Sequence, residues 1–476
     1  MSTRKTAVLA LILALSVLYL VKVVMPGRDR VAGERAMFAK LATADITRID
    51  ITRADLPDKK GERFTLDHSA DWSLVGVRGA VLDKGAIDGM IAGLNALDLG
   101  EQLQDRDLGG DLSVYGVDKP DFTIVVSEKS GQQTEVAFGK RSEYLSARYL
   151  KVSGRPGVYM TPEQSFQAVA KSSADLRSKT PFNFNSQDAR ELELITALGR
   201  INLTQPKVGE WKIVSPGEFP ASLEDVNSLM GAIQQISVAE FIDDPSLTAQ
   251  SLGLSKPRAT VRVELREGAI PAKINLDLWA AQSQGEGKPQ TIYITSSETD
   301  TVFKLARDPS DLIVKDLTDL RDKDLVKLPV SSIASVVSGG SADTPVTIAV
   351  DGLSWKVNGK ESDPVFVEQL LKDISALKAV DFPESVAADV FNEPFLTLAI
   401  TKNDPEKSVL NLTIGREIDP KATDLTRYAK LSNTQTIFAI RDVEAKRVTP
   451  HEEALVAKPT PVPTAATTAT AVAAAH

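Results

Sequence analysis

One pattern recurs three times in this chain and constrains its fold more than any other sequence feature. Each occurrence places a Tyr ten residues before a second aromatic residue, within alternating apolar and polar residues. The three pairs are Tyr149 and Tyr159, Tyr293 and Phe303, and Tyr428 and Phe438. A pattern repeated at long, regular spacing predicts a tandem array of similar units rather than one large domain.

Other motifs recur in the same order and fix the length of the unit. Trp72, Trp211 and Trp355 lie 139 and 144 residues apart, each in a short strand-like segment. A turn follows in each copy, and its residues are Gly116 and Pro120, Gly253 and Pro257, and Pro394. The sequence D-L-R-x-K, with Arg177 and Arg321, then ends the first two copies. It does not follow Phe438, and Val390 replaces the turn glycine, so the third copy is expected to be a degenerate capping repeat.

Hydrophobic periodicity predicts an α+β unit of about 140 residues. Segments such as 46–53, 62–67 and 71–75 alternate apolar and polar residues, which is typical of half-buried strands. Residues 82–99 have apolar side chains at helical spacing, and 223–241 and 365–382 repeat the pattern. A shorter helix is expected from Pro162, with Thr161 as its N-cap. Each unit is therefore predicted to be an antiparallel, meander-rich sheet with one long and one short helix.

These patterns divide the chain of 476 residues into units of ordinary domain size. The first copy is expected at residues 45–182, the second at 183–326 and the third at 327–450. Residues 457–476 are rich in Pro, Thr and Ala, and such a tail cannot bury enough apolar surface to fold.

The N-terminus carries a membrane signal. Arg4 and Lys5 precede an apolar run from Ala7 to Val21 that resumes after Lys22, which is about the length of a membrane-spanning helix. A cleaved signal peptide would begin in the same way, but no small-residue cleavage site follows the run. Residues 1–30 are therefore interpreted as a short cytoplasmic tail and an uncleaved single-pass anchor. The rest of the chain would lie outside the cytoplasm.

Composition argues against several classes of function. The net charge of -9 disfavours nucleic-acid binding, and the absence of Cys excludes disulfides and thiolate metal sites. His68 lies in a predicted turn, and His451 and His476 are far from it in sequence, so no metal centre or Ser-His-Asp arrangement is expected. We expect no catalytic residues, cofactor or metal. A carboxylate-dependent hydrolase is a remaining alternative, for which Asp243 and Asp244 would be one half of an acid/base pair, although charged turns are usually only solvated.

Two sets of repeated residues allow more than one role. The aromatic pairs would form a stacking platform for a sugar or peptide, or would keep the fold as cross-strand partners, which their recurrence favours; the tryptophans are expected in the core. Arg177 and Arg321 would bind an anionic group, because a guanidinium grips carboxylate or phosphate with two bonds. Alternatively they close one repeat against the next, and their positions at the junctions favour this role.

The order of these motifs resembles that of DUF4340, a bacterial envelope repeat family with a domain of unknown function. The resemblance covers about residues 45–450 and is strongest in the first two copies. It implies an envelope protein with a single N-terminal anchor and an accessory role beside ABC-type transporters of the gliding-motility-associated kind. It carries no catalytic residues over to this chain. The expected function is thus a non-catalytic extracytoplasmic scaffold with envelope or transporter proteins as partners, and the alternative is a module that binds a cell-wall glycan or peptide.

Overall fold

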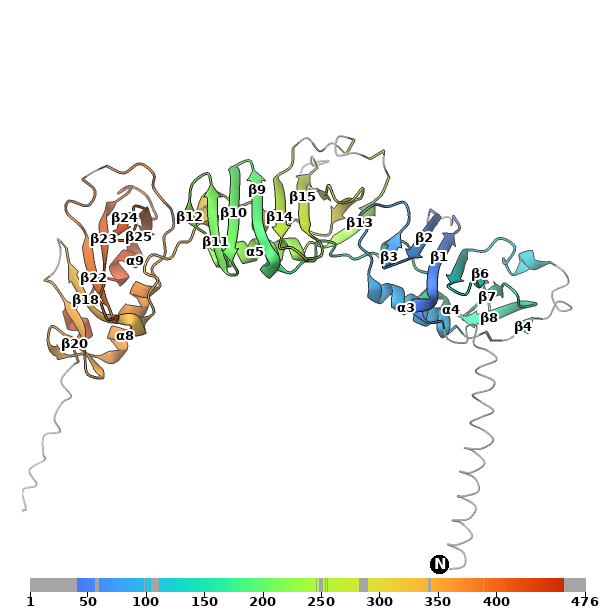
Figure 1. Cartoon of the computed structure of the whole chain (residues 1–476), viewed down its shortest axis with the longest axis horizontal. Helices are drawn as coiled ribbons and strands as arrows, with labels where there is room; N and C mark the ends of the chain where they lie inside the picture. Colours follow the sequence, from blue (N-terminus) through green and yellow to red (C-terminus); the bar gives the residue numbers. More distant parts are fainter. Residues whose placement is uncertain are drawn as a thin grey trace, which may run out of the picture. The chain divides into compact units, whose positions relative to one another are not determined.

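The computed structural model describes residues 41–457 apart from 56–59, 98, 101, 104–110, 245, 248–250, 253, 255, 282–289, 341–343 and 388. The described chain forms two compact units. Unit 1 contains the described residues up to Glu218 and those of Glu224–Asp316, and unit 2 contains Phe219–Leu223 and the described residues from Leu317 onward. Unit 1 holds two antiparallel sheets and unit 2 holds a third (Figure 1).

The first sheet has the strand order β3-β2-β1-β5-β6-β7-β8-β4. Its strands are β1 (Ile46–Arg53), β2 (Glu62–His68), β3 (Trp72–Leu74), β4 (Gln102–Leu103), β5 (Phe122–Glu128), β6 (Gln133–Arg141), β7 (Ala147–Val152) and β8 (Val158–Pro162). The central strands pair antiparallel, with Ile49 opposite Val126. The chain therefore builds two meanders and joins them through its first strand.

Within unit 1, the strands of the second sheet repeat this order as β11-β10-β9-β14-β15-β16-β17-β13. These strands are β9 (Ala189–Thr196), β10 (Gly199–Lys207), β11 (Glu210–Ser215), β13 (Val238–Ile242), β14 (Ala259–Leu265), β15 (Lys273–Ala280), β16 (Ile292–Thr295) and β17 (Val302–Leu305). Leu194 lies opposite Val261, as Ile49 lies opposite Val126 in the first sheet. Equivalent strands thus bury equivalent apolar positions.

The third sheet, in unit 2, has the order β21-β20-β19-β18-β22-β23-β24-β25. Its strands are β18 (Ile333–Gly339), β19 (Thr347–Asp351), β20 (Ser354–Val357), β21 (Lys360–Glu361), β22 (Leu396–Lys402), β23 (Val409–Glu417), β24 (Thr426–Leu431) and β25 (Ile437–Arg441). A bridge between Asp381 and Ala439 takes the place that β4 and β13 have at the edges of the other sheets. The two-residue strand β12 (Phe219–Pro220) also belongs to unit 2.

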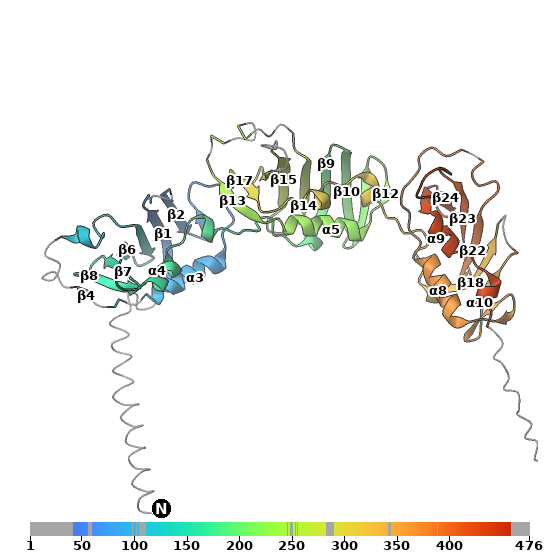
Figure 2. The ribbon, with the colours of Figure 1, turned by 180° about the vertical axis from the view of Figure 1, so that it is seen from behind.

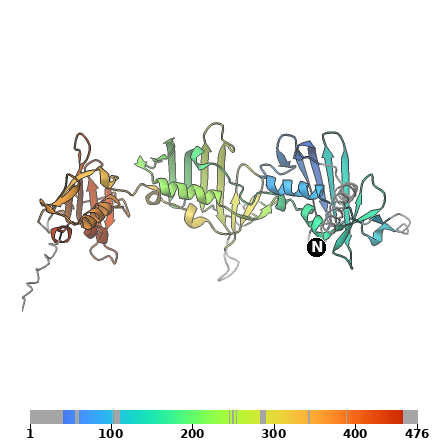
Figure 3. The ribbon, with the colours of Figure 1, turned by 90° about the horizontal axis from the view of Figure 1, so that it is seen from below.

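One long helix covers one face of each sheet, as Figures 2 and 3 show for α3 (Lys84–Asn95), α5 (Leu223–Gln234) and α8 (Pro364–Ser375). Four positions are buried in all three helices: Ile87, Met90, Ile91 and Leu94 in α3, Val226, Leu229, Met230 and Ile233 in α5, and Val367, Leu370, Leu371 and Ile374 in α8. Burying one such side chain stabilises the fold by roughly 1.5–3 kcal/mol. The buried side chains of each long helix therefore pack the helix onto its sheet and form part of the hydrophobic core.

The remaining helices are short. The α-helices are α4 (Glu163–Val169), α6 (Ser310–Ile313), α7 (Leu317–Leu320), α9 (Asp442–Arg447) and α10 (Glu452–Leu455). The 3-10 turns are η2 (Thr43–Asp45), η3 (Leu112–Val114), η4 (Ala174–Leu176), η5 (Ser186–Asp188) and η6 (Val330–Ser332). The α+β class is confirmed.

Three local predictions were wrong. The helix predicted over 223–241 ends at Gln234, and β13 begins at Val238. The backbone of residues 238–242 pairs with β17 as a strand, so these residues do not continue the helix. The helix predicted from Pro162 begins at Glu163 with Pro162 as its N-cap, and the buried Thr161 hydroxyl makes no capping bond. His68 ends β2 rather than lying in a turn; its ring stacks on Trp72 at 4.2 Å.

The predicted anchor at residues 1–30 lies outside the described residues, as does the predicted tail apart from Ala457. Among the helices that the structure does describe, none combines the length and apolar character of a membrane span.

Candidate functional site: the arginine clusters that close the copies

The segments that end the copies pair with the segment before the long helix in the same way each time. In the first copy, Asp83 N donates to Leu176 O and Ser178 N donates to Val81 O, both at 2.9 Å. In unit 2 two further ladders repeat these bonds. They are Ser222 N to Leu320 O and Asp322 N to Pro220 O, and Asp363 N to Leu455 O and Ala457 N to Glu361 O. Residues 174–178, 318–322 and 453–457 are therefore equivalent, and we call them the closing segments.

The third closing segment lies beyond residue 450, where the third copy is expected to end. Its isolated bridge joins Ser362 to Val456, where the first two copies join Leu82 to Arg177 and Ala221 to Arg321. Val456 thus stands in the position of the arginine. The absence of D-L-R-x-K after Phe438 reflects a changed side chain, while the backbone pairing that closes the unit persists through Ala457.

Arg177 lies in unit 1 and is almost completely enclosed, with a side chain only 1% exposed. Its Nη1 donates to Asp243 Oδ2 at 2.7 Å, and its Nη2 donates to Thr301 Oγ1 at 2.7 Å. The Thr301 hydroxyl donates in turn to Asp243 Oδ1 at 2.6 Å. The guanidinium also lies 4.1 Å above the centre of the Phe241 ring. An ion pair, two hydrogen bonds and stacking therefore hold this cation within the unit, and its buried Nε has no hydrogen-bond partner among the described residues.

Arg321, in unit 2, also lies against aromatic rings, but no described residue forms a hydrogen bond or ion pair with its guanidinium. Its guanidinium lies 3.9 Å from the centre of the Phe219 ring and 3.7 Å from that of Phe382, and the residue is 8% exposed. Burial lowers the pKa of Arg321, and the charges of Glu384 and Asp381 offset this only in part. Phe382 occupies the place of Phe241, since β13 and the segment around Asp381 pair with equivalent strands.

The first copy lacks the partners that receive an arginine in the other two. Its edge strand places Gln102 opposite Tyr159, where the second places Phe241 opposite Phe303. Gln102 Nε2 instead donates to Pro156 O at 2.9 Å. Gly157, two residues before Tyr159, replaces the threonine found two residues before Phe303, and its φ of 79° brings it close to Leu103 O. The first segment thus contributes an arginine, Arg177, but has none of the residues that contact such an arginine in the later segments.

The repeated aromatic residues do not face one another across their hairpins, so the prediction of directly opposed aromatic pairs was wrong. Tyr159 lies opposite Leu150, and Tyr149 lies opposite Met160. The offset recurs in the other two hairpins, where Phe303 lies opposite Ile294 and Phe438 opposite Ala429. Because side chains alternate between faces, the first aromatic points away from the second in every copy. The tyrosines Tyr149, Tyr293 and Tyr428 are all half-buried.

The other signature residues also have structural surroundings. Trp211 is buried, while Trp72 and Trp355 are half-buried and pack against the cores of their sheets. Gly116 has a φ of 69°, which favours glycine. The turn prolines Pro120, Pro257 and Pro394 are described, whereas Gly253 lies outside the described residues.

A second recurrent arginine was missed by the sequence analysis. Arg148 Nη1 contacts Asp121 at 2.8 Å and its guanidinium stacks on Phe166 at 4.0 Å. Arg427 in the third copy contacts Glu417 at 2.8 Å and also bonds Asp442. Both residues directly precede the repeated Tyr, and that adjacency was the available signal. Asp243 was considered only as half of an acid/base pair and Thr301 was not named, because 58 residues separate the two in sequence.

Comparison with known families identifies the class of protein to which this chain belongs. The family described as domain of unknown function (DUF4340) matches residues 72–207 and 211–411, more than half of the chain. The chain is a member of the DUF4340 family. The two matched segments begin at Trp72 and Trp211, which supports the sequence periodicity. No curated protein and no solved structure matched the chain.

Proposed function

We propose that this protein is a non-catalytic, membrane-anchored extracytoplasmic scaffold or accessory subunit of an envelope transport system of the ABC type. The observation that carries the proposal is the recurrence of one sheet-and-helix build in three successive segments. We interpret these as three tandem copies of one unit. Several linked modules suit repeated, avid contact with proteins, because each further contact is made at a high effective concentration.

The sheet faces opposite the long helices support a contact role. In the first copy Arg48 pairs with Asp50 at 2.8 Å, and in the second Arg262 pairs with Glu193 at 2.5 Å. These are half-exposed, polar surfaces on strands that are rigidly held by hydrogen bonds on both sides. The proposal for the membrane rests on the apolar run at residues 7–25, which would hold the scaffold at the inner membrane.

The test is a mild-detergent pull-down of tagged full-length protein from native membranes. Stoichiometric recovery of a transporter permease or ATPase is expected. A matched control exchanges residues 1–30 for an unrelated single-pass span, and this variant should recover the same partner if the folded units make the contact. Recovery of the protein alone would refute the scaffold role. So would a hydrolytic activity that disappears when one carboxylate is neutralised.

A second candidate is a module that binds a cell-wall glycan or peptide. The placement of the tyrosines favours it, since Tyr149, Tyr293 and Tyr428 lie on the opposite face from the second aromatic residues and keep part of their surface exposed. Aromatic rings on a sheet face can stack on sugars. Tyr149, however, packs edge-on against Tyr115 at 4.9 Å, which supports a structural role for that copy. Pull-down of peptidoglycan fragments by wild type but not by a Tyr293→Ala, Tyr428→Ala variant would favour this candidate.

A further inference from the structure

Arg321 is a buried cation that no described residue pairs directly, although the charges of Glu384 and Asp381 act on it from farther away. Among the residues that the structure describes, its guanidinium makes no hydrogen bond or ion pair; the contacts it has are with the Phe219 and Phe382 rings. Stacking satisfies the faces of a guanidinium but leaves its N–H donors, which lie in the plane, without acceptors. An enclosed charge of this kind is costly, so an acceptor supplied by a ligand would be bound favourably.

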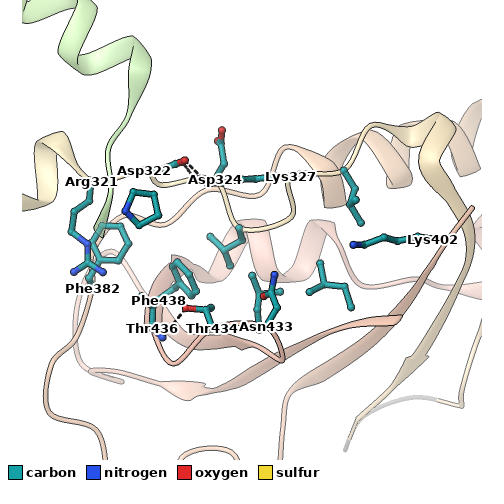
Figure 4. Close-up of a pocket in the computed structure, with 15 residues that line it drawn as sticks. Arg321, Asp322, Asp324, Lys327, Phe382, Lys402, Asn433, Thr434, Thr436 and Phe438 are labelled. Atoms are coloured by element: carbon teal, nitrogen blue, oxygen red, sulfur yellow. Dashed lines mark hydrogen bonds and ion pairs between the residues drawn. The ribbon is translucent and has the colours of Figure 1, made fainter. Parts of the chain in front are cut away.

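Arg321 forms one end of a pocket of about 270 Å³ that lies within unit 2 (Figure 4). Lys402 lies at the opposite end, and Asn433, Thr434 and Thr436 lie between the two cations. The apolar part of the lining consists of Leu325, Leu328, Leu410, Leu431, Phe382 and Phe438. The pocket thus combines two separated positive charges, hydroxyl and amide groups, and aliphatic surface.

The acidic residues of the pocket do not neutralise these cations. Asp322 pairs with Lys327, and Asp324 pairs with Lys378 at 3.5 Å. The Lys402 ammonium forms no ion pair with any described residue. The pocket therefore has an excess of positive charge in a partly apolar setting, where a charge–charge contact is stronger than in water.

The second copy shows how a carboxylate fits such a site. There Asp243 accepts from Arg177 at 2.7 Å and from Thr301 at 2.6 Å, beside the ring of Phe241. In unit 2 the corresponding residues are Arg321, Thr436 and Phe382, with Thr436 two residues before Phe438 as Thr301 is two before Phe303. The residue in the place of Asp243 is Glu384, which is exposed and makes no bond to Arg321. Around Arg177 the carboxylate comes from Asp243 of the chain itself. Around Arg321 the equivalent aromatic and threonine residues are present, but no carboxylate of the described residues binds the arginine.

We propose that the Arg321 pocket binds a carboxylate group of a peptide that is not part of this chain, with Arg321 and Thr436 as its hydrogen-bond donors. The carboxylate takes the position that Asp243 has beside Arg177. The adjacent leucines contact the aliphatic part of the peptide, and Lys402 contacts a second anionic or carbonyl group. Free C-termini and Asp or Glu side chains share this chemistry. The inference goes beyond the scaffold role and does not depend on it, since the geometry of unit 2 alone carries it.

The test is hydrogen exchange of the full-length protein in detergent, titrated with small peptides. Two probes present the carboxylate differently: N-acetyl-Ala-Ala with a free C-terminus, and N-acetyl-Ala-Glu amide with only a side-chain carboxylate. N-acetyl-Ala-Gln amide is the uncharged control. We expect at least one carboxylate probe to slow exchange in residues 317–328 and 433–438, with an affinity at least tenfold higher than that of the uncharged peptide. The tighter of the two identifies the source of the carboxylate.

Variants separate the proposed site from a general charge effect. Arg321→Met should weaken the carboxylate probe at least tenfold, and Thr436→Val, which keeps every charge, should weaken it about threefold. Lys372→Gln removes one positive charge from an exposed side chain of α8, outside the pocket lining, and should change affinity less than twofold. Glu384→Gln should leave binding unchanged or tighten it. Thermal melts of each variant verify the fold.

The proposal is overturned if neither carboxylate probe protects these segments in the wild type. It is equally overturned if the amide control or inorganic phosphate binds as tightly as the carboxylate probes, or if Arg321→Met binds as well as the wild type. Loss of partner recovery in the pull-down with intact peptide binding would refute the scaffold role alone, so the two failures are distinguishable.

Discussion

Replacing Arg177 or Arg321 by methionine should reduce stability by clearly different amounts. Arg177→Met removes two charge-assisted hydrogen bonds, each worth about 1.5–3 kcal/mol, from a guanidinium that is 1% exposed. It also leaves Asp243 without its cation. Losing one partner of a fully buried pair costs about 3–5 kcal/mol. The Asp243 side chain is 32% exposed and keeps its bond from Thr301, so we expect a smaller loss, about 2–3 kcal/mol.

Arg321→Met should change stability by no more than about 1 kcal/mol. No hydrogen bond is lost, because the contacts of this guanidinium are with two rings. Each cation–π contact contributes about 0.5–1 kcal/mol. Methionine is unbranched and flexible and also packs favourably on aromatic rings. Its introduction removes the cost of enclosing an unpaired charge, which offsets the lost stacking.

Hydrogen exchange by mass spectrometry measures both changes locally in the full chain. For Arg177→Met, opening of β13 and β17 should become roughly a hundredfold more frequent, since 1.4 kcal/mol corresponds to a factor of ten. For Arg321→Met, exchange in β25 should change less than tenfold. Asp243→Asn and the double variant complete a cycle whose coupling energy should exceed about 1.5 kcal/mol. Equal destabilisation by the two methionine variants would refute the reasoning from hydrogen bonds.

Three further predictions concern other residues of the chain. The hydrogen bonds from Lys446 and Arg427 outweigh burial and hold the pKa of Asp442 below its ordinary value. That stabilisation is present above the unfolded pKa of about 3.9 and is lost as pH falls through the lower folded pKa, so wild type should lose its advantage over Asp442→Asn below about pH 4 in thermal melts. Gly116→Ala should destabilise unit 1 by about 1–3 kcal/mol in urea, because a Cβ would lie 2.7 Å from Lys140 Cγ at a φ of 69°. The control Gly131→Ala, at a φ of 84° with open space around it, should cost only about 1 kcal/mol. An equal loss in the two variants would contradict the steric argument. Gly79→Ala would place a Cβ 2.1 Å from Glu298 O and should break the Arg78–Asp300 ion pair, which faster exchange at residues 296–301 would show; Gly76→Ala, with nothing within 4 Å, is its control.

The sequence predicted the repeated layout because that layout rests on local periodicity. The apolar spacing of Ile87, Ile91 and Leu94 identified the core face of α3, and all three side chains are buried. Alternation likewise identified most strands. Helix ends were less predictable: residues 238–242 fit a helical pattern, and only their pairing with β17 makes them a strand. Propensity is overridden there by hydrogen bonds to a segment some 60 residues away in sequence.

The candidate site was predicted only in part, for a related reason. The repeated D-L-R-x-K drew attention to Arg177 and Arg321, but their surroundings come from distant segments. Asp243 and Thr301 meet Arg177 across 66 and 124 residues, so spacing alone does not associate them. Equivalence of Val456 with the two arginines depends on backbone pairing that no side-chain motif records. The difference between a paired and an unpaired guanidinium is a matter of three-dimensional arrangement.

The distribution of the closing-segment residues has a consequence for how such a chain can grow. If the three segments are copies of one unit, as we propose, the first offers Arg177 and has Gln102 and Gly157 in place of the receiving residues, whereas the third has receiving residues and carries Val456 in place of the arginine. The middle copy alone has both sets. Duplication of the middle segment would therefore lengthen the chain and still give every arginine a set of residues to contact. Duplication of the first segment would leave an arginine without these contacts, and duplication of the third would leave the contacting residues without an arginine. The residues at the ends of the segments therefore specify the order of the segments. Recombination that changes this order should be selected against, even though the three sheets have the same strand order.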